Sequence, residues 1–502
     1  MGLFLFSLPA WAQPIGLRAN TMTGIKRGDQ TLQYLEGNVS FSQNGSTVMC
    51  DNAEYDNGSK TLFGRGNVRI FSNDGANITG STLTYNDNSK VARVEGNVQL
   101  NDGSMVLNAP YLVYNTASKV GYYGGGGRII DGGQTLTSST GSYNSGAKTI
   151  YFKGNVVLTD PKYVLKADTL QYKTNTKTAY FYSYTEITDG KAKIFCNNGW
   201  YQTQTGKAFL TRGAAIYQEA QVIKADTLTY DRETGIGKAF GNLWVRDTVE
   251  HMTIFGQNGY YNQKLGYTRV VKKALVQRID DGEDTLYMRA DTFIYISDSA
   301  TKRRNLTAMG TVRIWQPAFS GFCDSLQYGM TDSLLRLYGK PVLYNENTQL
   351  TSDSMKMEMR NNRLKTMWMY KNAMNIVEED TGHYSQIMGD NITNYFADND
   401  RSLRESRVVG NTQSIYFIRE KDSVISSVNK VSAAEMRIVM QDGKVGRIKM
   451  YNKPKGKVYP IDQFPVAEGK LSAFAWKPEA KPLSTEFKAP YPEPIILLKK
   501  RK

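Results

Sequence analysis

The sequence predicts an all-β protein, an elongated and repetitive stack of bent antiparallel strands. Three observations predict this class. Apolar and polar residues alternate with a period of two, Gly-Asn-Val returns at nearly constant spacing, and clusters of Asn, Asp and Gly punctuate the alternation. No segment carries a convincing pattern for a long amphipathic helix. The chain of 502 residues accommodates about fourteen units of ~30 residues each.

The first element of the unit is a strand with a glycine at its middle. It reads "LEGNVSF" at 35–41, "GRGNVRIF" at 64–71, "VEGNVQL" at 94–100 and "FKGNVVL" at 152–158, so the first four glycines are spaced by 29, 30 and 58 residues. A glycine inside a strand marks a bulge, a bend or a close backbone approach. We therefore expect a row of bends along stacked strands, at Gly37, Gly66, Gly96, Gly154, Gly241 and Gly310.

The second element is a strand of the form Ala-Asp-x-Leu-x-Tyr followed by a polar turn with Lys. It reads "ADTLQYKT" at 167–174 and "ADTLTYDR" at 225–232. The recurring Asp is expected at the start of its strand, in a turn-side hydrogen bond. The recurring Tyr shares a face with Leu, which favours a wall or core position over a stacking platform. The Lys of the turn lies either on a rim that meets lipid phosphates or on a solvated surface.

Bent strands stacked in register would enclose a continuous apolar interior. From residue 92 to residue 100, small or apolar residues occupy the even positions and polar ones the odd positions, which gives one buried and one wet face. The inward positions are the candidates for lining a lipid groove: Val39, Val68, Leu83, Tyr85, Val98, Leu100, Val156, Leu170, Tyr172, Leu228, Tyr230 and Val312.

Residues with catalytic or metal-binding chemistry are few. The three cysteines, Cys50, Cys196 and Cys323, occupy the small-residue position before Asp or Asn, several units apart, so they are expected to be buried thiols rather than a disulfide or metal site. His251 and His383 lie in different units, and no zinc-type spacing occurs. No Gly-x-Ser-x-Gly elbow or singled-out carboxylate pair is present. We expect no catalytic residues, no metal and no cofactor.

The ends of the chain differ from its repeats. Leu3 to Leu8 and the sequence Ala10-Trp11-Ala12 resemble a secretory signal peptide over residues 1–12, cleaved near Ala12. We expect regular repeats over 13–270, looser repeats over 271–452, and an extended or partly disordered Pro-rich basic tail over 453–502. No later stretch reaches the ~18 apolar residues of a membrane helix. The net charge of +15 favours an anionic partner, or serves solubility alone.

The ordered pair of motifs resembles the OstA/LptA family of lipopolysaccharide-transport proteins. The residues that carry the resemblance are "STLTYNDNSKVARVEGNVQL" (81–100), "ADTLQYKTNTKTAYF" (167–181) and "ADTLTYDRETGIGKAFGNLWV" (225–245), and it extends over roughly 17–415. The resemblance implies a periplasmic β-jellyroll that holds lipid A acyl chains between its sheets. Its implied partners are lipopolysaccharide, jellyroll proteins of the inner- and outer-membrane transport complexes, and further copies of the chain docked head to tail.

Two other functions remain open on the sequence. A period of ~30 residues also suits a parallel β-helix that binds or cleaves polysaccharide, although the units show two apolar runs rather than three. A structural scaffold of the envelope would have a filled core without a groove. Nucleic acid is not expected as a partner, since the Tyr residues share the apolar face.

Overall fold

The computed structural model describes residues 16–491, except 29, 44, 74, 191, 280–284, 299, 361–362, 398–401, 421–423 and 442–443. The expected signal peptide lies outside the described residues. The chain divides between Glu219 and Ala220 into two compact units, which we call unit 1 and unit 2. The sequence placed its change from regular to looser repeats later, at residue 270.

Unit 1 is built from strands. They are β1 (Gly16–Arg18), β2 (Thr21–Arg27), β3 (Gln30–Gln43), β4 (Ser46–Asp56), β5 (Thr61–Phe71), β6 (Asn77–Asn86), β7 (Val91–Asn101), β8 (Val106–Asn115), β9 (Val120–Gly124), β10 (Gly127–Asp131), β11 (Gln134–Ser138), β12 (Thr140–Asn144), β13 (Thr149–Thr159), β14 (Tyr163–Lys173), β15 (Thr178–Phe181), β16 (Thr185–Asp189), β17 (Ala192–Cys196), β18 (Asn198–Gln202) and β19 (Lys207–Gln218).

Unit 2 continues with strands and four short 3-10 turns after the last of them. Its strands are β20 (Gln221–Asp231), β21 (Ile236–Asp247), β22 (Met252–Asn262), β23 (Tyr267–Arg278), β24 (Leu286–Asp298), β25 (Arg303–Gln316), β26 (Phe319–Gly329), β27 (Leu334–Tyr338), β28 (Val342–Asn345), β29 (Thr348–Thr351), β30 (Ser354–Arg360), β31 (Arg363–Asp380), β32 (His383–Phe396), β33 (Leu403–Arg419), β34 (Ile425–Gln441), β35 (Lys444–Tyr451) and β36 (Lys455–Pro460). The 3-10 segments are η1 (Gln263–Leu265), η2 (Ile461–Gln463), η3 (Val466–Glu468), η4 (Pro478–Ala480) and η5 (Ser484–Phe487).

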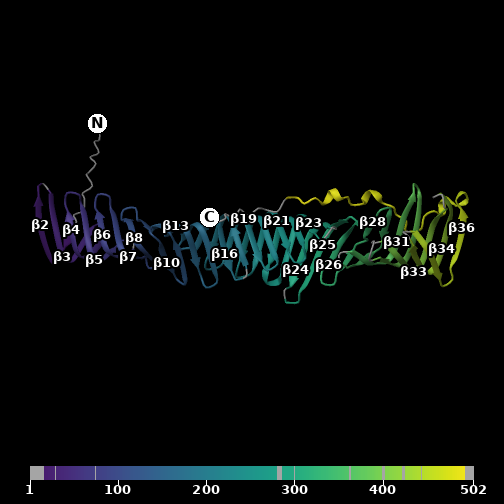
Figure 1. Ribbon diagram of the computed structural model, residues 1–502, viewed down its shortest axis with the longest axis horizontal. Helices are drawn as coiled ribbons and strands as arrows, with labels where there is room; N and C mark the ends of the chain where they lie inside the picture. Colours follow the sequence, from purple (N-terminus) through teal and green to yellow (C-terminus); the bar gives the residue numbers. More distant parts are fainter. Residues whose placement is uncertain are drawn as a thin grey trace, which may run out of the picture. The chain divides into compact units, whose positions relative to one another are not determined.

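Within each unit the strands follow one another in chain order and pair with their neighbours (Figure 1). Every pairing between strands within a unit, among the described residues, is antiparallel, as in β5–β6, β6–β7 and β25–β26. The prediction of an all-β repetitive fold with antiparallel strands is therefore confirmed. A parallel β-helix is excluded, because its coils pair in parallel.

Each long strand bends at its middle, and several strands are interrupted there. β9 and β10 both pair with β8, so they are two halves of one strand, broken at Gly125 and Gly126. β15 and β16 stand in the same relation to β14. In uninterrupted pairs the ladder register shifts at this place, for example between Arg65 and Val68 of β5 where it pairs with β6. Each strand thus contributes one half to each of two facing sheets.

The bend is formed by two consecutive residues in the left-handed backbone region. Gly66 has φ 77° and Asn67 has φ 43°, and the same pair recurs at Gly96 and Asn97 with φ 83° and 49°. Glycine adopts positive φ without steric cost, and asparagine tolerates it better than most residues. This explains why Asn usually follows Gly in the motif, although Thr311 takes the same position after Gly310 with φ 45°. All six expected bend glycines have φ between 72° and 83°.

The two sheets differ in the residues that they turn inward. We call one the tyrosine sheet; in unit 1 its inner row contains Tyr85, Ala92, Tyr114, Gly121, Tyr143, Ile150, Tyr172, Ala179, Tyr201 and Ala208. We call the other the aliphatic sheet; its inner row contains Phe41, Val48, Ile70, Ile78, Leu100, Leu107, Ile129, Leu136, Leu158, Leu165, Ile187, Ile194 and Ile216. All of the aliphatic row is buried.

The outer face of the aliphatic sheet differs between the units. In unit 1, positions such as Arg69, Gln99 and Lys166 face solvent. In unit 2, the corresponding row of paired residues runs Trp244, Phe255 and Leu275, and all three are buried. Phe487 from η5 packs on this cluster. The second face of the unit 2 sheet is therefore covered by the end of the chain.

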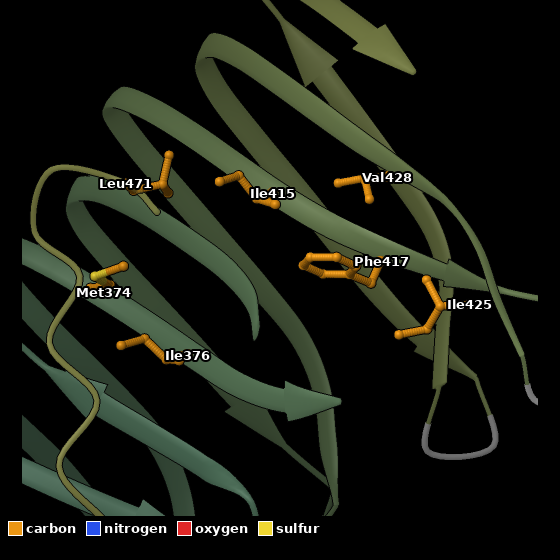
Figure 2. Packing of buried hydrophobic residues seen from close by; sticks show 7 residues of the cluster. All are labelled: Met374, Ile376, Ile415, Phe417, Ile425, Val428 and Leu471. Atoms are coloured by element: carbon orange, nitrogen blue, oxygen red, sulfur yellow. The ribbon is translucent and has the colours of Figure 1, made fainter. Parts of the chain in front are cut away.

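A second cluster on the same unit is covered in the same way. Leu471 packs with Met374, Ile376, Ile415, Phe417, Ile425 and Val428 (Figure 2). Two buried glutamines hold the backbone of the covering segment. Gln386 donates to the Gly469 carbonyl at 2.7 Å and accepts from the Leu471 amide at 2.9 Å. Gln349 makes the equivalent pair with Ala475 and Lys477, at 2.5 and 2.8 Å.

We call residues 461–491 the C-terminal strap. It runs from β36 back along unit 2 as far as β21 and β22 (Figure 1), where the Tyr491 hydroxyl donates to the Gly256 carbonyl at 2.7 Å. The sequence predicted an extended or partly disordered tail over 453–502. The described part of it, to residue 491, packs on unit 2, because its apolar side chains and backbone groups find partners on the sheet.

Candidate functional site: the apolar interior and its latched mouth

The expected lipid-lining residues lie in the interior of the two units. Each of the twelve is between 0 and 7% exposed, and Tyr230 has the highest value. Val98 and Leu100 follow the bend of β7 on the aliphatic sheet, while Leu83 and Tyr85 belong to the tyrosine half of β6. The alternation of period two thus places residues from both halves of the strand motif on one enclosed apolar surface.

The recurring Asp has a different place from the one that the sequence suggested. Asp51 lies in the middle of β4, at the bend, rather than at the start of its strand. Its Oδ2 accepts a hydrogen bond from Asn67 Nδ2 at 2.9 Å, and Asp226 accepts one from Asn242 at 3.0 Å. A Cβ on Gly66 would come within 2.3 Å of Asp51 Oδ2. The Asp of one strand therefore fits against the bend of the next.

The two rows of turns that lie opposite the bends are joined in places by buried polar contacts, and the line between these rows is the opening through which the interior could be reached. We call this opening the mouth. In unit 1 the Tyr143 hydroxyl, on the tyrosine sheet, donates to Asp102 in the turn of the aliphatic sheet. Lys148 Nζ lies 3.4 Å from the same carboxylate, whose side chain is fully buried. We call this set of Tyr, Asp and a basic residue across the mouth a latch.

The latch recurs one repeat later and again in unit 2. Tyr172 donates to Asp131 at 2.9 Å, and Lys177 Nζ lies 2.5 Å from it. In unit 2, Tyr295 donates to Asp247 at 2.7 Å, with Arg304 Nε at 3.9 Å. In each latch the Asp lies at the edge of one sheet and the Tyr comes from the other sheet. Their hydrogen bond therefore joins the two sheets.

Burial and charge at the latches shift the pKa values of their members. Burial by itself would raise the pKa of Asp102, but hydrogen bonds from Tyr143, Ser104 and two backbone amides lower it to about 2. Burial and the Asp131 carboxylate raise the pKa of Tyr172. The lowered pKa keeps Asp102 as the anion, and the raised pKa keeps Tyr172 as the neutral donor, the protonation states that favour such a hydrogen bond.

The sequence reading missed the latches. Asp102 and Asp131 stand in "NDG" and "DGG", which were read only as turn signals, and each lies 41 residues before the Tyr that it binds. That shared offset in unit 1 was the available signal; in unit 2, Asp247 and Tyr295 are 48 residues apart. Five of the six lysines that were expected in turns have the positive φ of a turn residue: Lys60, Lys90, Lys119, Lys148 and Lys177. The expectation was wrong for the sixth, Lys207, which begins β19.

The remaining chemistry-bearing residues form no common site. Cys50, Cys196 and Cys323 are buried and free, as expected, and burial raises the pKa of the Cys196 thiol to about 12. Among the residues that the structure describes, no group of three or more His, Cys, Asp or Glu side chains could hold a metal ion. No helix in this part of the chain is long and apolar enough to cross a membrane.

Comparisons with known proteins match the repeats of unit 1. Residues 15–168 and 154–212 match the family model described as OstA-like protein. No curated protein matches the chain. Among solved structures, the extracellular domain of a putative one-component system from B. thetaiotaomicron is 8% identical, with 80% of this chain and 90% of that chain covered, at a TM-score of 0.10. A likeness at that score carries no information about fold or function.

Proposed function

Residues 15–212 are OstA-like, and from this premise we propose that the chain is a non-enzymatic lipid carrier of the periplasm. Its cargo is lipopolysaccharide, whose lipid A acyl chains lie between the tyrosine and aliphatic sheets on the way to the outer membrane. The observation that carries the proposal is the aliphatic inner row, which passes from strand to strand through unit 1 without a polar residue.

The inner row suits acyl chains for a physical reason. Ile70, Ile78 and Leu100 are direct cross-strand neighbours and at most 1% exposed. A lipid tail that packs against such residues is removed from water, which is favourable by ~25 cal/mol of free energy per Å² of apolar surface buried. Since adjacent strands repeat at ~4.8 Å, each tail can move along the row without meeting a charged group. The proposed partners are transport-complex proteins with jellyroll domains, and further copies docked head to tail.

Photo-crosslinking in the cell tests the proposal. A photoreactive residue at Leu170, Tyr172, Val156 or Val98 should label lipopolysaccharide. The same probe at Thr169, Gln171 or Asn97, on the outer face of the same strands, should not. Labelling of the outer positions with none at the inner ones would reject a groove between the sheets. Normal delivery of lipopolysaccharide to the surface after depletion of the protein would reject the transport role.

One observation favours a structural scaffold as a second candidate. The twelve proposed lining residues are 0 to 7% exposed, and the mouth is latched, as in a filled core. The two functions differ in what happens on adding lipid. In a carrier, the latch strands should exchange faster as the lipid separates the two sheets, whereas in a scaffold exchange should stay unchanged at every latch.

A further inference from the structure

The latches place their cations on the solvent side and their anions inside. The side chains of Lys148 and Lys177 are 37% and 22% exposed, while those of Asp102 and Asp131 are 0% and 4% exposed. A solute that reaches the mouth therefore meets an ammonium group first. The arrangement is the same in unit 2, where Arg304 is 26% exposed and Asp247 2%.

A lipid in the interior would leave its head group at the mouth. The bends close the opposite side with continuous backbone, so a lipid whose tails lie against Leu100 or Leu158 reaches solvent between the two rows of turns. Separating these rows breaks the latches. Each released cation then lies beside the head group, and each released Asp regains water.

The free energy cost of opening the latches depends on the charge of the lipid head group. Leaving a partly buried Lys without its carboxylate costs free energy, since a charge-assisted hydrogen bond is lost. A phosphate on the lipid replaces the carboxylate and offsets this loss, whereas an uncharged head group does not. The net charge of +15 further favours an anionic head group over a neutral one.

We propose that the latches are exchange sites for lipid phosphate: a phosphate of an acylated lipid displaces the latch Asp from its Lys as the mouth opens. This inference rests on the proposed carrier function. The exchanged state keeps the head group at the mouth and the tails inside. The latch lysines, Lys148 and Lys177, are then the head-group ligands in unit 1, and the latch Asp is the internal competitor that keeps an empty interior closed.

The phosphate exchange can be tested by loading two fluorescent lipids into the full chain. One lipid is a bisphosphorylated acylated disaccharide, and the other is its dephosphorylated form. The wild-type protein should load the phosphorylated lipid on the order of tenfold faster, as expected for one charge-assisted contact. Lys177→Gln should lower that preference. Lys60→Gln is the matched control, because Lys60 has the same turn position and donates to Asn57 of its own turn at 2.6 Å; it should keep the preference.

Substituting the latch Asp instead of the Lys weakens the latch but leaves its cation in place. Asp131→Asn should speed the loading of both lipids, since the closed state loses its internal ion pair. A denaturation midpoint near that of the wild type would show that each variant is folded. Equal loading of the two lipids by the wild-type protein, or an unchanged preference in Lys177→Gln, would overturn the exchange and leave the carrier function intact.

Two further outcomes separate the sources of failure. If neither lipid loads and neither labels an interior probe, the carrier function itself fails. Inorganic phosphate alone should leave hydrogen exchange at the latch strands unchanged, because it has no tails to separate the sheets. Faster exchange with inorganic phosphate would identify a site for the free anion and overturn the lipid head-group assignment.

Discussion

At the scale of single residues, the bend needs a glycine for two independent reasons. Gly66 has φ 77°, and a Cβ would come within 2.3 Å of Asp51 Oδ2. The Asp is in turn held by Asn67. An Asp, a Gly and an Asn from two strands therefore form one local unit. Sequence spacing predicted the glycine as a bend, but the Asp contact depends on the register between strands, which spacing alone does not give.

Gly66→Ala should lower the free energy of unfolding by about 1 to 3 kcal/mol, the usual cost of a strained backbone position. The loss comes from the unfavourable φ and from displacement of Asp51. Gly133→Ala is the control, since that glycine has no neighbour within 4 Å of an added Cβ. The midpoint of chemical denaturation measures both variants. Equal denaturation midpoints for Gly66→Ala and Gly133→Ala would show that the bend tolerates a side chain at Gly66.

The Asp102 latch should make unit 1 sensitive to acid. The pKa of Asp102 is about 2 in the folded chain and ~3.9 in an unfolded one. A lowered folded pKa contributes stability that is present above the unfolded value and lost as pH falls through about 4 toward 2, by about 2 kcal/mol in all. Asp102→Asn should flatten this part of the stability curve, measured by denaturation between pH 6 and pH 2. Parallel curves for the variant and the wild type would contradict it.

At the scale of elements, the C-terminal strap explains why the later repeats look irregular. In "LWV" at 243–245 and "ALV" at 274–276 consecutive apolar residues replace the alternation, because the outer face of the aliphatic sheet is buried there as well. A sheet that is covered on both faces loses its period of two. The sequence showed the loss of pattern, but the covering segment is more than two hundred residues away, so no local signal identified it.

Leu471→Ala should destabilise unit 2 by about 2 to 5 kcal/mol, because it leaves a cavity in the cluster with Ile415 and Phe417. Leu483→Ala on the same strap is the control: its side chain is 60% exposed, so the change should cost less than ~0.5 kcal/mol. Thermal or chemical denaturation measures the difference. Similar effects from both substitutions would mean that the strap does not depend on this contact.

At the scale of the whole molecule, the division into two units predicts more than one unfolding step. Phe487 packs on Trp244, Phe255 and Leu275, all in unit 2. Phe487→Ala should therefore speed hydrogen exchange in the strands of unit 2 and leave those of unit 1 unchanged. Exchange resolved by mass spectrometry gives the two units separately. Equal acceleration in β6 and β22 would show that the chain unfolds as one cooperative body.

Much of the architecture was readable from the sequence, and the reason is repetition. The all-β class, the antiparallel strands, the bend glycines and the inward face follow from a local pattern repeated many times, so errors in one unit are corrected by the others. The latches and the strap were not predicted. Both join residues that are distant in sequence and appear only once the two sheets face each other.

The strap also gives unit 2 a distinct order of folding. Most strands bind their chain neighbours, so their contacts are local and can form progressively as the chain emerges. Tyr491, in contrast, reaches the backbone of Leu243 and Gly256, and Gln349 and Gln386 stay without these backbone partners until residues 469–477 arrive. The strands of unit 2 can be assembled while one of their apolar faces is still uncovered. A chaperone that shields apolar surface would therefore be needed longest by this unit, until the strap at 461–491 has been synthesised.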